Sequence, residues 1–309
     1  MPECQSQGKA ATFGPILDRL LPDKTRETMK ETGLAKLLHQ CMAEFFGTLF
    51  IVLFGVGSVC SAVSSGMLMG LWQVAVVWGF GVALAIYATA AVSSAHLNPA
   101  VTLACAVTGR FPFRLVVPYW VAQMLGGFVG GLINLSVFGP LINAMEAANG
   151  NGSDHGVTTA MMFGEYFPHP GLPGTVPDVS VGHALGVEAW GTGILMFIIL
   201  VLTDPSNCCL RNKDAAPFLI GFTVAVLISC YAPLTQAGFN PARDLGPRLA
   251  AAVAGWGETA IPGPRSGFWV YVLGPMLGAP LGAVLYDQTL GPAMNMGHRR
   301  GVCCKHERD

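Results

Sequence analysis

The tripeptide Asn-Pro-Ala occurs twice in this chain, and each copy opens a short apolar segment: Asn98-Pro99-Ala100 and Asn240-Pro241-Ala242. Asn is a preferred helix N-cap, and Pro fits the first helical position because the N–H that it lacks would have no partner there. Each tripeptide therefore predicts the start of a helix. These helices end near Gly109 and Gly255 after about 10 and 14 residues, or roughly 15–21 Å at 1.5 Å per residue. A hydrocarbon core of roughly 30 Å is too thick for one such helix, but two helices laid end to end from opposite faces can cross it.

The composition places these segments in a membrane protein. Of the 309 residues, 52% are hydrophobic and 11% are charged, whereas average soluble domains carry about 25% charged residues. Six apolar stretches have about the 20 residues that a membrane-spanning helix needs: about 41–64, 71–93, 115–138, 184–203, 215–233 and 267–286. Because these stretches are continuous rather than alternating, they predict helices and not a β-barrel.

The two halves of the chain repeat each other. Segment 43–48 resembles segment 187–192, and the Glu in each precedes its Asn-Pro-Ala by nearly the same distance: 54 residues for Glu44 and 52 for Glu188. Two motifs at constant spacing indicate an internal repeat. Each half holds three spans, an odd number, so the second half must be inverted in the membrane. The predicted fold is all-α: six transmembrane helices with two re-entrant half-helices in an inverted 3+3 repeat.

The residues around the two tripeptides resemble the paired motifs of the major intrinsic proteins, the aquaporin family. They are more similar to its aquaglyceroporin, or glycerol-facilitator-like, branch than to its water-only branch. The resemblance covers about 38–288 and lies mainly in Ser94-Ala95-His96-Leu97-Asn98-Pro99-Ala100-Val101-Thr102 and Gly238-Phe239-Asn240-Pro241-Ala242-Arg243-Asp244. It implies a passive channel for water and small neutral solutes such as glycerol, which excludes ions and protons, is no enzyme, needs no cofactor and forms a homotetramer.

On this basis we expect a channel domain at 39–288 between two tails, 1–38 and 289–309. Within it the first repeat covers about 39–138, an extracellular connection 139–182, and the second repeat about 183–288. Both tails contain Lys and Arg, whereas 139–182 contains neither. Cytoplasmic segments carry an excess of these residues, so both termini are expected in the cytoplasm. We expect a multi-pass protein of the plasma membrane, and Asn151 starts a possible glycosylation sequon.

Three polar residues carry the predicted pore chemistry. A capping Asn accepts from its own helix through its side-chain oxygen, which leaves its NH₂ free to donate to a passing solute. Asn98 and Asn240 are expected to do this, although both can also be ordinary caps. Arg243 lies three residues after Asn240 and hence on the same helical face. The equivalent residue of the first repeat is Val101, so only one end of the pore carries a charge. A structural ion pair of Arg243 with Asp244 is the alternative.

The resemblance further implies a selectivity ring around Arg243, formed with Trp78, Ile228 and Ala237. Trp78 offers an apolar face for carbon atoms, unless it packs in the core or against lipid. Ile228 stands where water-selective members have His and cannot provide that hydrogen bond. Ala237 is small where the bacterial type has a second aromatic residue, which predicts a wide ring.

Asp244 and Arg248 match an acid and a base of the glycerol-conducting branch, and we read them as a brace and a subtype marker. Tyr271 departs from that branch, which tends to have Pro at this position.

Two acids lie inside predicted spans, Glu44 and Glu188. An unpaired acid would be costly at that depth. We expect each to accept hydrogen bonds from the backbone of a re-entrant loop, since such backbone must find partners within the protein. A proton relay is the alternative. His96, two residues before Asn98, is expected to brace its loop as well.

Other functions fit less well. A water-selective aquaporin and a coupled secondary transporter remain alternatives, the latter because transporters also use inverted repeats and half-helices. A membrane enzyme would need a cluster of His, carboxylate or nucleophilic residues, which the motifs do not provide. The net charge of -1 argues against a nucleic-acid partner, and Cys303-Cys304 with His306 lacks the second ligand pair of a zinc site. The expected partners are therefore water, glycerol, similar uncharged solutes and membrane lipid.

Overall fold

The structure is a computed structural model that describes residues 33–148, 156–171 and 178–299. Most of the predicted N-terminal tail, the end of the C-terminal tail and Asn151 lie outside the described residues. Within these described residues, six helices are long and apolar enough to cross a membrane, which confirms the predicted fold class. Their bounds are α3 Leu34–Ser65, α4 Leu71–Ser93, α6 Val116–Ala148, α8 Val181–Thr203, α9 Ala216–Thr235 and α12 Val270–Gln288. Two short helices, α5 (Pro99–Val107) and α10 (Pro241–Ala251), start at the two Asn-Pro-Ala tripeptides.

Shorter elements connect these helices or follow the last of them. They are η1 Phe113–Leu115, α7 Val157–Ala160, η2 Cys208–Leu210, η3 Lys213–Ala215, η4 Ala252–Trp256, α11 Gly257–Ala260, η5 Pro264–Ser266 and α13 Leu290–Arg299. The helix boundaries differ most from the sequence prediction at three places. Helix α3 starts within the predicted N-terminal tail, α13 occupies part of the predicted C-terminal tail, and α6 continues beyond residue 138 into the predicted connection.

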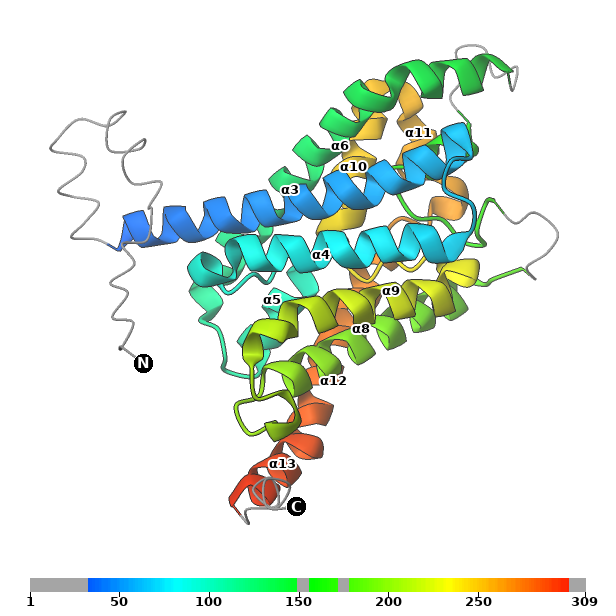
Figure 1. Ribbon diagram of the computed structural model, residues 1–309. Coiled ribbons are helices and arrows are strands. Elements are labelled where there is room, and N and C mark those ends of the chain that lie inside the picture. Colours follow the sequence, from blue (N-terminus) through cyan, green and yellow to red (C-terminus); the bar gives the residue numbers. More distant parts are fainter. Residues whose placement is uncertain (1–32, 149–155, 172–177, 300–309) are drawn as a thin grey trace, which may run out of the picture.

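Each repeat is a set of three spans that holds the half-helix of the other repeat. Helices α3, α4 and α6 form the first set, α8, α9 and α12 the second, and α4 packs against α9 between them. Half-helix α10 packs against α6, and half-helix α5 packs against α12. Figure 1 shows α5 and α10 enclosed by the long helices. The two repeats therefore exchange their half-helices, and the symmetry of the sequence becomes a symmetry of contacts.

Close approach of the helices depends on small residues. A Cβ atom built on Gly278 of α12 would lie 1.9 Å from the carbonyl oxygen of Ala189 on α8. A Cβ atom built on Gly79 of α4 would lie 2.5 Å from the carbonyl oxygen of Gly221 on α9, and one built on Gly221 would lie 2.2 Å from the carbonyl oxygen of Gly79. Glycines at such contacts let two helix backbones pack tightly. Close packing matters here because the hydrophobic effect does not drive helices together within lipid.

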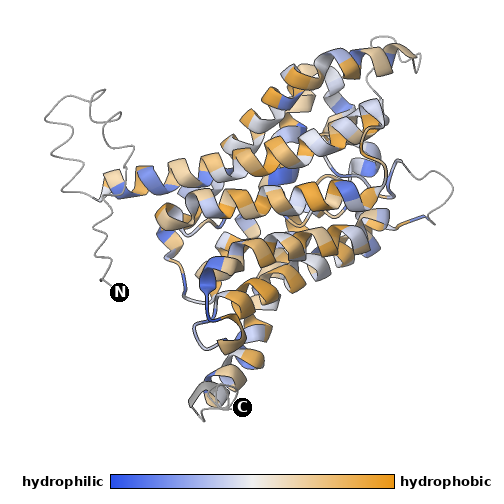
Figure 2. Ribbon diagram, viewed as in Figure 1, coloured by the Kyte–Doolittle hydropathy of each residue, from blue (hydrophilic) through white to orange (hydrophobic). Residues whose placement is uncertain are grey.

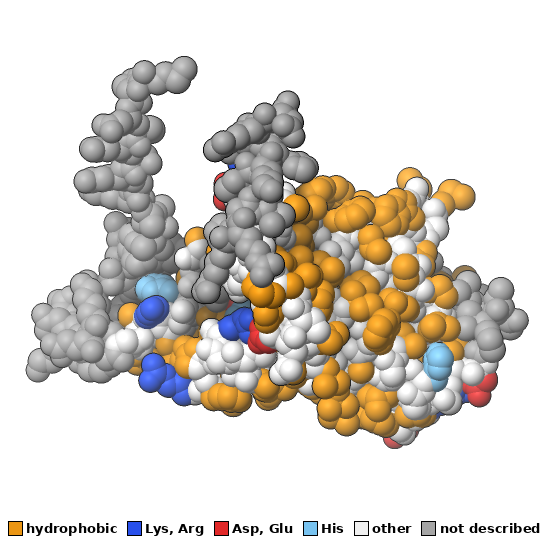
Figure 3. Space-filling model, turned by 90° about the horizontal axis from the view of Figure 1, so that it is seen from below, with side chains coloured by type: hydrophobic (Ala, Val, Ile, Leu, Met, Phe, Trp, Pro, Cys, Tyr) orange, Lys and Arg blue, Asp and Glu red, His pale blue; other side chains and the backbone are white. Residues whose placement is uncertain are grey.

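The outside of the bundle is apolar. Large hydrophobic side chains are exposed on several helices, among them Phe80 of α4, Trp190 of α8 and Leu281 of α12. Figure 2 shows hydrophobic residues along the long helices, and Figure 3 shows hydrophobic side chains spread over a broad part of one face. An exposed apolar surface of this extent is what a membrane-embedded protein presents to lipid.

Candidate functional site

The two half-helices begin with the same cap. Asn98 has an extended backbone, and its side-chain oxygen accepts from Ala100 N at 2.9 Å. Asn240 does the same for Ala242 N at 3.0 Å and also accepts from Arg243 N at 3.3 Å. Each cap thus satisfies N–H groups that a helix start leaves without a partner.

The same two side chains tie the half-helices together. The amide nitrogen of Asn98 donates to the carbonyl oxygen of Phe239 at 2.9 Å, and that of Asn240 donates to the carbonyl oxygen of Leu97 at 2.8 Å. From the sequence, each NH₂ group is expected to be free to donate to a solute. In the structure one N–H of each is used in this crossed pair, and because the group has two, one remains available.

The two loops before these caps share an unusual backbone. Three residues without the freedom of Gly adopt positive φ in each loop, at the same positions relative to Asn: Ser94, Ala95 and Leu97 in the first loop, and Gln236, Ala237 and Phe239 in the second. A left-handed residue costs about 1–2 kcal/mol. Neither loop can therefore hold this shape without support from its surroundings.

Two buried carboxylates provide that support. Glu44 of α3 accepts from His96 N at 3.0 Å and Leu97 N at 2.7 Å. Glu188 of α8 accepts from Gly238 N at 3.0 Å and Phe239 N at 2.7 Å, and also from the hydroxyl group of Thr235. Both acids are fully buried.

One turn after each acid, a glycine gives room to the loop. A Cβ atom on Gly47 would lie 2.3 Å from the Leu97 side chain, and one on Gly191 would lie 2.2 Å from the Phe239 ring. Leu97 and Phe239 are the residues directly before the two Asn caps. The repeated Glu-x-x-Gly pattern therefore forms a binding surface for each loop. The Glu accepts hydrogen bonds from the loop's amide groups, and the Gly leaves room for the side chain that precedes the Asn cap.

A third polar group holds the first loop. The hydroxyl group of Thr102 donates to Asn98 O at 3.1 Å, accepts from Gln123 Nε2 at 3.0 Å and contacts His96 Nδ1 at 3.2 Å. Gln123 also donates to Glu44 at 2.7 Å. Gln123 is a polar residue within an apolar span, and that was the signal from which the sequence could have identified it.

A cavity of about 640 Å³ lies along both loops and both half-helix starts. Its lining includes Asn98, Val101, Asn240 and Arg243, together with apolar side chains of α4, α8 and α9. Asp204, Lys213 and Arg110, from the connections that follow α8 and α5, also line it. Within the described ranges, no group of three or more His, Cys, Asp or Glu side chains is placed to hold a metal ion.

All four residues of the predicted ring line this cavity: Trp78, Ile228, Ala237 and Arg243. The Arg243 guanidinium carbon lies 4.2 Å from the centroid of the Trp78 ring, and Nη2 donates to the carbonyl oxygen of Ala237 at 2.6 Å. The small Ala237 side chain predicts a wide ring, and the width of the ring stays a prediction. The structure shows the guanidinium group in contact with both Trp78 and the Ala237 carbonyl oxygen. Trp78 is buried and also packs on Gly55 of α3.

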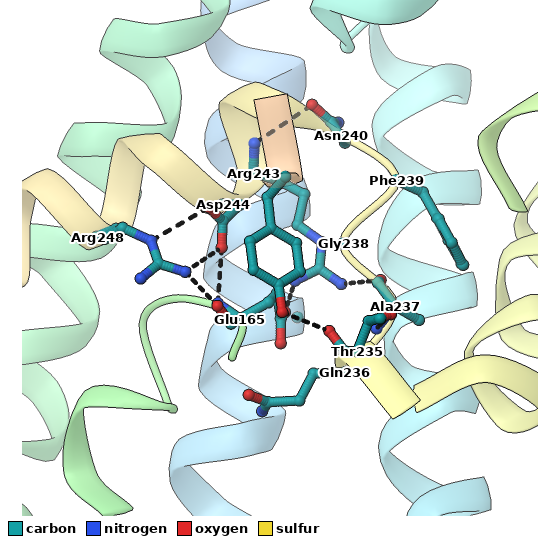
Figure 4. Close-up of polar contacts among 12 residues, drawn as sticks. Glu165, Thr235, Gln236, Ala237, Gly238, Phe239, Asn240, Arg243, Asp244 and Arg248 are labelled. Atoms are coloured by element: carbon teal, nitrogen blue, oxygen red, sulfur yellow. Dashed lines mark hydrogen bonds and ion pairs between the residues drawn. The ribbon is translucent and has the colours of Figure 1, made fainter. Parts of the chain in front are cut away.

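The ion pairs around Arg243 differ from the alternative that the sequence left open. Arg243 forms its ion pair with Glu165, whereas Asp244 pairs with Arg248, whose Nη2 lies 3.0 Å from Asp244 Oδ1. Figure 4 shows the four side chains together beside the second loop. Sequence reasoning missed Glu165 because it belongs to the connection 139–182, which carries no repeat motif and no fixed spacing to either tripeptide.

Arg248 and its neighbours hold the segment around Glu165 in place. Arg248 donates to the carbonyl oxygens of Glu165 and Ala260, and its guanidinium carbon lies 4.6 Å from the centroid of the Tyr166 ring. Burial raises the pKa of Tyr166 to about 12, against the opposing effect of the Arg248 charge. The Tyr166 hydroxyl group therefore stays protonated at neutral pH and donates to Thr259 O at 2.9 Å. The Tyr271 hydroxyl group donates to the carbonyl oxygen of Thr235 at 3.0 Å and so supports the start of the second loop.

Comparison with known proteins agrees with this geometry. Residues 31–286 match the sequence model of the family described as "Major intrinsic protein". The chain is 41% identical over 259 residues to a glycerol uptake facilitator protein of Haemophilus influenzae, a match that covers 82% of this chain and 95% of that protein. It is also 41% identical over 259 residues to a propanediol uptake facilitator of Citrobacter freundii, with 82% and 93% covered.

Among solved structures, the aquaglyceroporin from Plasmodium falciparum has a similar fold. The TM-score is 0.73 at 23% sequence identity, and the match covers 84% of this chain and 99% of the other. The family match extends over most of the sequence and includes both half-helices, both loops and all six spans. The chain therefore belongs to the major intrinsic protein family.

Proposed function

We propose that this protein is a passive channel for glycerol and other small uncharged solutes, water among them. The observation that carries this proposal is the cavity of about 640 Å³, in which apolar walls are combined with donors from Asn98, Asn240 and Arg243. A polyol needs an apolar surface for its carbon atoms and a few donors for its hydroxyl oxygens. The relatives named as glycerol and propanediol uptake facilitators, at 41% identity, support the same class of solute.

The half-helix starts would also exclude ions and protons. Each helix N-terminus carries roughly half an elementary positive charge. The crossed hydrogen bonds of Asn98 and Asn240 hold the two N-termini close to each other. A cation or hydronium ion at this point would meet a positive barrier, as described for aquaporin-type pores, whereas a neutral solute would not.

Glycerol is preferred over a water-only function because of the ring. Ile228 lines the cavity and is aliphatic. It therefore cannot form the hydrogen bond to a passing water molecule that a water-selective ring would provide at this position. Asp244 and Arg248 match the glycerol-conducting branch and form a buried pair. Tyr271 is the residue that favours the water-selective alternative, and its hydroxyl group is used to support the second loop.

Passive transport is preferred over coupled transport because the two candidate acids are already engaged. A coupled transporter needs an acid that can bind and release an ion in the path. Glu44 and Glu188 are fully buried, and each accepts two backbone N–H groups of a loop. Protonation or ion binding at either acid would remove the support of strained backbone.

For the cellular setting, we propose that residues 39–288 form the channel domain of a plasma-membrane protein with both termini in the cytoplasm. The positive-inside rule supports this orientation, because 139–182 has no Lys or Arg. We also propose a homotetramer with one pore in each subunit, which the family resemblance supports.

Swelling of liposomes that contain the purified protein tests the function. Wild-type protein should admit water and glycerol, with rates that do not change when a proton or sodium gradient is imposed. Ile228→Trp should fill the ring and stop glycerol entry. Val226→Trp is the matched control, because Val226 lies on the same helix and is 38% exposed on the outer surface. Glycerol entry that follows an ion gradient, or that both variants leave unchanged, would contradict the proposal.

A further inference from the structure

The segment that carries Glu165 is bound to half-helix α10 and to the second loop through backbone groups of Glu165 and Tyr166. Glu165 N donates to Asp244 Oδ1 at 2.6 Å, and its carbonyl oxygen accepts from Arg248. The next amide, Tyr166 N, donates to Gln236 Oε1 of the second loop at 2.7 Å. Gly164 lies so near Arg248 that a Cβ atom would be 2.8 Å from the guanidinium carbon. The position of the Glu165 backbone is therefore set by the same helix that carries Arg243.

From this position the Glu165 side chain reaches Arg243. The two side chains form an ion pair in which the exposed fractions are 6% for Arg243 and 9% for Glu165. Figure 4 shows the carboxylate on one side of the guanidinium group and the carbonyl oxygen of Ala237 on another. Arg243 lines the cavity and Glu165 does not. Glu165 therefore contacts Arg243 and does not itself form the cavity wall.

The charges of this cluster cancel. Arg243 and Arg248 are balanced by Glu165 and Asp244 in two buried pairs. A guanidinium group without its partner would be a strong site for a small anion, because it presents several donors in a planar fork and little water surrounds it. A planar anion that entered the cavity would meet the same donors that Glu165 now occupies.

We propose that Glu165 is a positioning residue that keeps small anions out of the ring by occupying the anion site of Arg243. The ring is then neutral toward solutes, and Arg243 contributes hydrogen-bond donors to the pore without a free positive charge. This inference rests on the proposed glycerol channel and adds to it the class of solute that is rejected at the Arg243 end of the cavity.

Glycerol entry into liposomes in isotonic sodium nitrate tests the proposal, because nitrate is planar and keeps its charge at every working pH. Sodium gluconate serves as the bulky-anion reference. Wild-type protein should give the same glycerol rate in both salts. Glu165→Gln should be slowed by nitrate about tenfold, the factor that corresponds to about 1.4 kcal/mol of anion binding. Asp178→Asn is the matched control, because it removes another acid that pairs with an Arg, Arg265, at an exposed site.

Two further variants separate positioning from a merely structural role. In the double variant Arg243→Ala with Glu165→Gln, the sensitivity to nitrate should disappear, whereas a folding defect would persist. Glu165→Ala should be as sensitive to nitrate as Glu165→Gln, and it replaces Glu165→Gln if that variant does not fold. The inference is overturned if wild-type protein conducts glycerol and the Glu165 variants ignore nitrate, or if the double variant remains sensitive. Wild-type protein that conducts no glycerol would instead refute the proposed function.

Discussion

Glu44 and Glu188 each support, with a single side chain, a loop whose backbone does not form a regular helix. Each loop has three residues at positive φ, and each acid accepts two consecutive amides of that loop. At about 1–2 kcal/mol for each left-handed residue, a loop stores several kcal/mol of strain. A charge-assisted hydrogen bond contributes about 1.5–3 kcal/mol, so two of them offset much of this cost.

We predict that Glu188→Gln destabilises the protein and reduces glycerol entry. Glutamine has one acceptor oxygen, and its NH₂ group cannot accept from Gly238 N or Phe239 N. An unsatisfied buried donor costs about 1–3 kcal/mol, so the unfolding temperature in detergent should fall. Glu258→Gln, at an exposed site on α11, should change neither property. If Glu188 were a proton relay, its replacement would abolish a response to pH gradients and leave stability intact.

At the ring, we predict that Ile228→His reduces glycerol entry more than water entry. The imidazole adds a hydrogen-bonding group that suits water and removes apolar surface that suits the carbon atoms of glycerol. Parallel stopped-flow swelling in water and glycerol gradients measures the two rates. Ile228→Leu keeps the aliphatic wall and should keep their ratio. Equal losses of both rates in Ile228→His would mean that this position does not form the constriction.

At the residue scale, the sequence predicted those site residues that match the family's motifs. Trp78, Ile228, Ala237 and Arg243 were named from the resemblance, and they lie around one cavity; their roles in selection remain predictions. Glu165 was not found, because the fold brings it to Arg243 through contacts with Asp244 and Arg248 that no local pattern encodes. A residue whose position is set entirely by tertiary contacts leaves no periodic or spacing signal in a single sequence.

Helices α8 and α12 show how the elements of one repeat are held together. Gly278 and Gly282 of α12 lie one turn apart, and Cβ atoms on them would meet the carbonyl oxygens of Ala189 and Gly193 on α8 at 1.9 Å and 2.1 Å. Backbone atoms cannot yield as a flexible side chain can. The spacing of four residues in the sequence therefore marks a contact surface where the helix axes must come close.

We predict that Gly278→Ala destabilises the protein, because α12 must move away from α8 to admit one methyl group. Overpacking of this kind typically costs about 1–3 kcal/mol. Gly186→Ala on α8 is the control, because nothing lies within 4 Å of a Cβ atom there. This second change should stabilise the helix by up to about 1 kcal/mol. Opposite shifts of the unfolding temperature are expected, and shifts of the same sign would argue against the contact.

The spans were predictable as elements, but their ends were not. The third predicted span ends at about residue 138, and Gly139-Pro140 follows it, where Pro would usually interrupt a helix. Helix α6 continues through Pro140 to Ala148. Glu146 in this extension accepts from Gly156 N at 3.1 Å and from the Thr159 hydroxyl group. A tertiary anchor of this kind overrides a local stop signal, and the sequence alone does not reveal it.

In the whole molecule, the two repeats depend on each other. Half-helix α10 of the second repeat lies on α6, and half-helix α5 of the first lies on α12. The crossed hydrogen bonds of Asn98 and Asn240 join the two tips. The inverted repeat could be predicted from motif spacing and the odd number of spans. The exchange could not, because these spans are apolar on all sides and their sequences do not show which face binds which half-helix.

This exchange predicts that neither repeat forms a pore alone. A chain cut in the connection, expressed as residues 1–152 and 153–309, should assemble when both parts are made together, since the contacts of α5 with α12 and of α10 with α6 can form between separate chains. Glycerol swelling of liposomes with the co-purified parts should approach that of the intact chain, and each part alone should give none. Affinity purification through a tag on one part measures the assembly directly. Glycerol entry through a single part would show that the half-helices are not exchanged, because that part would then contain a complete path.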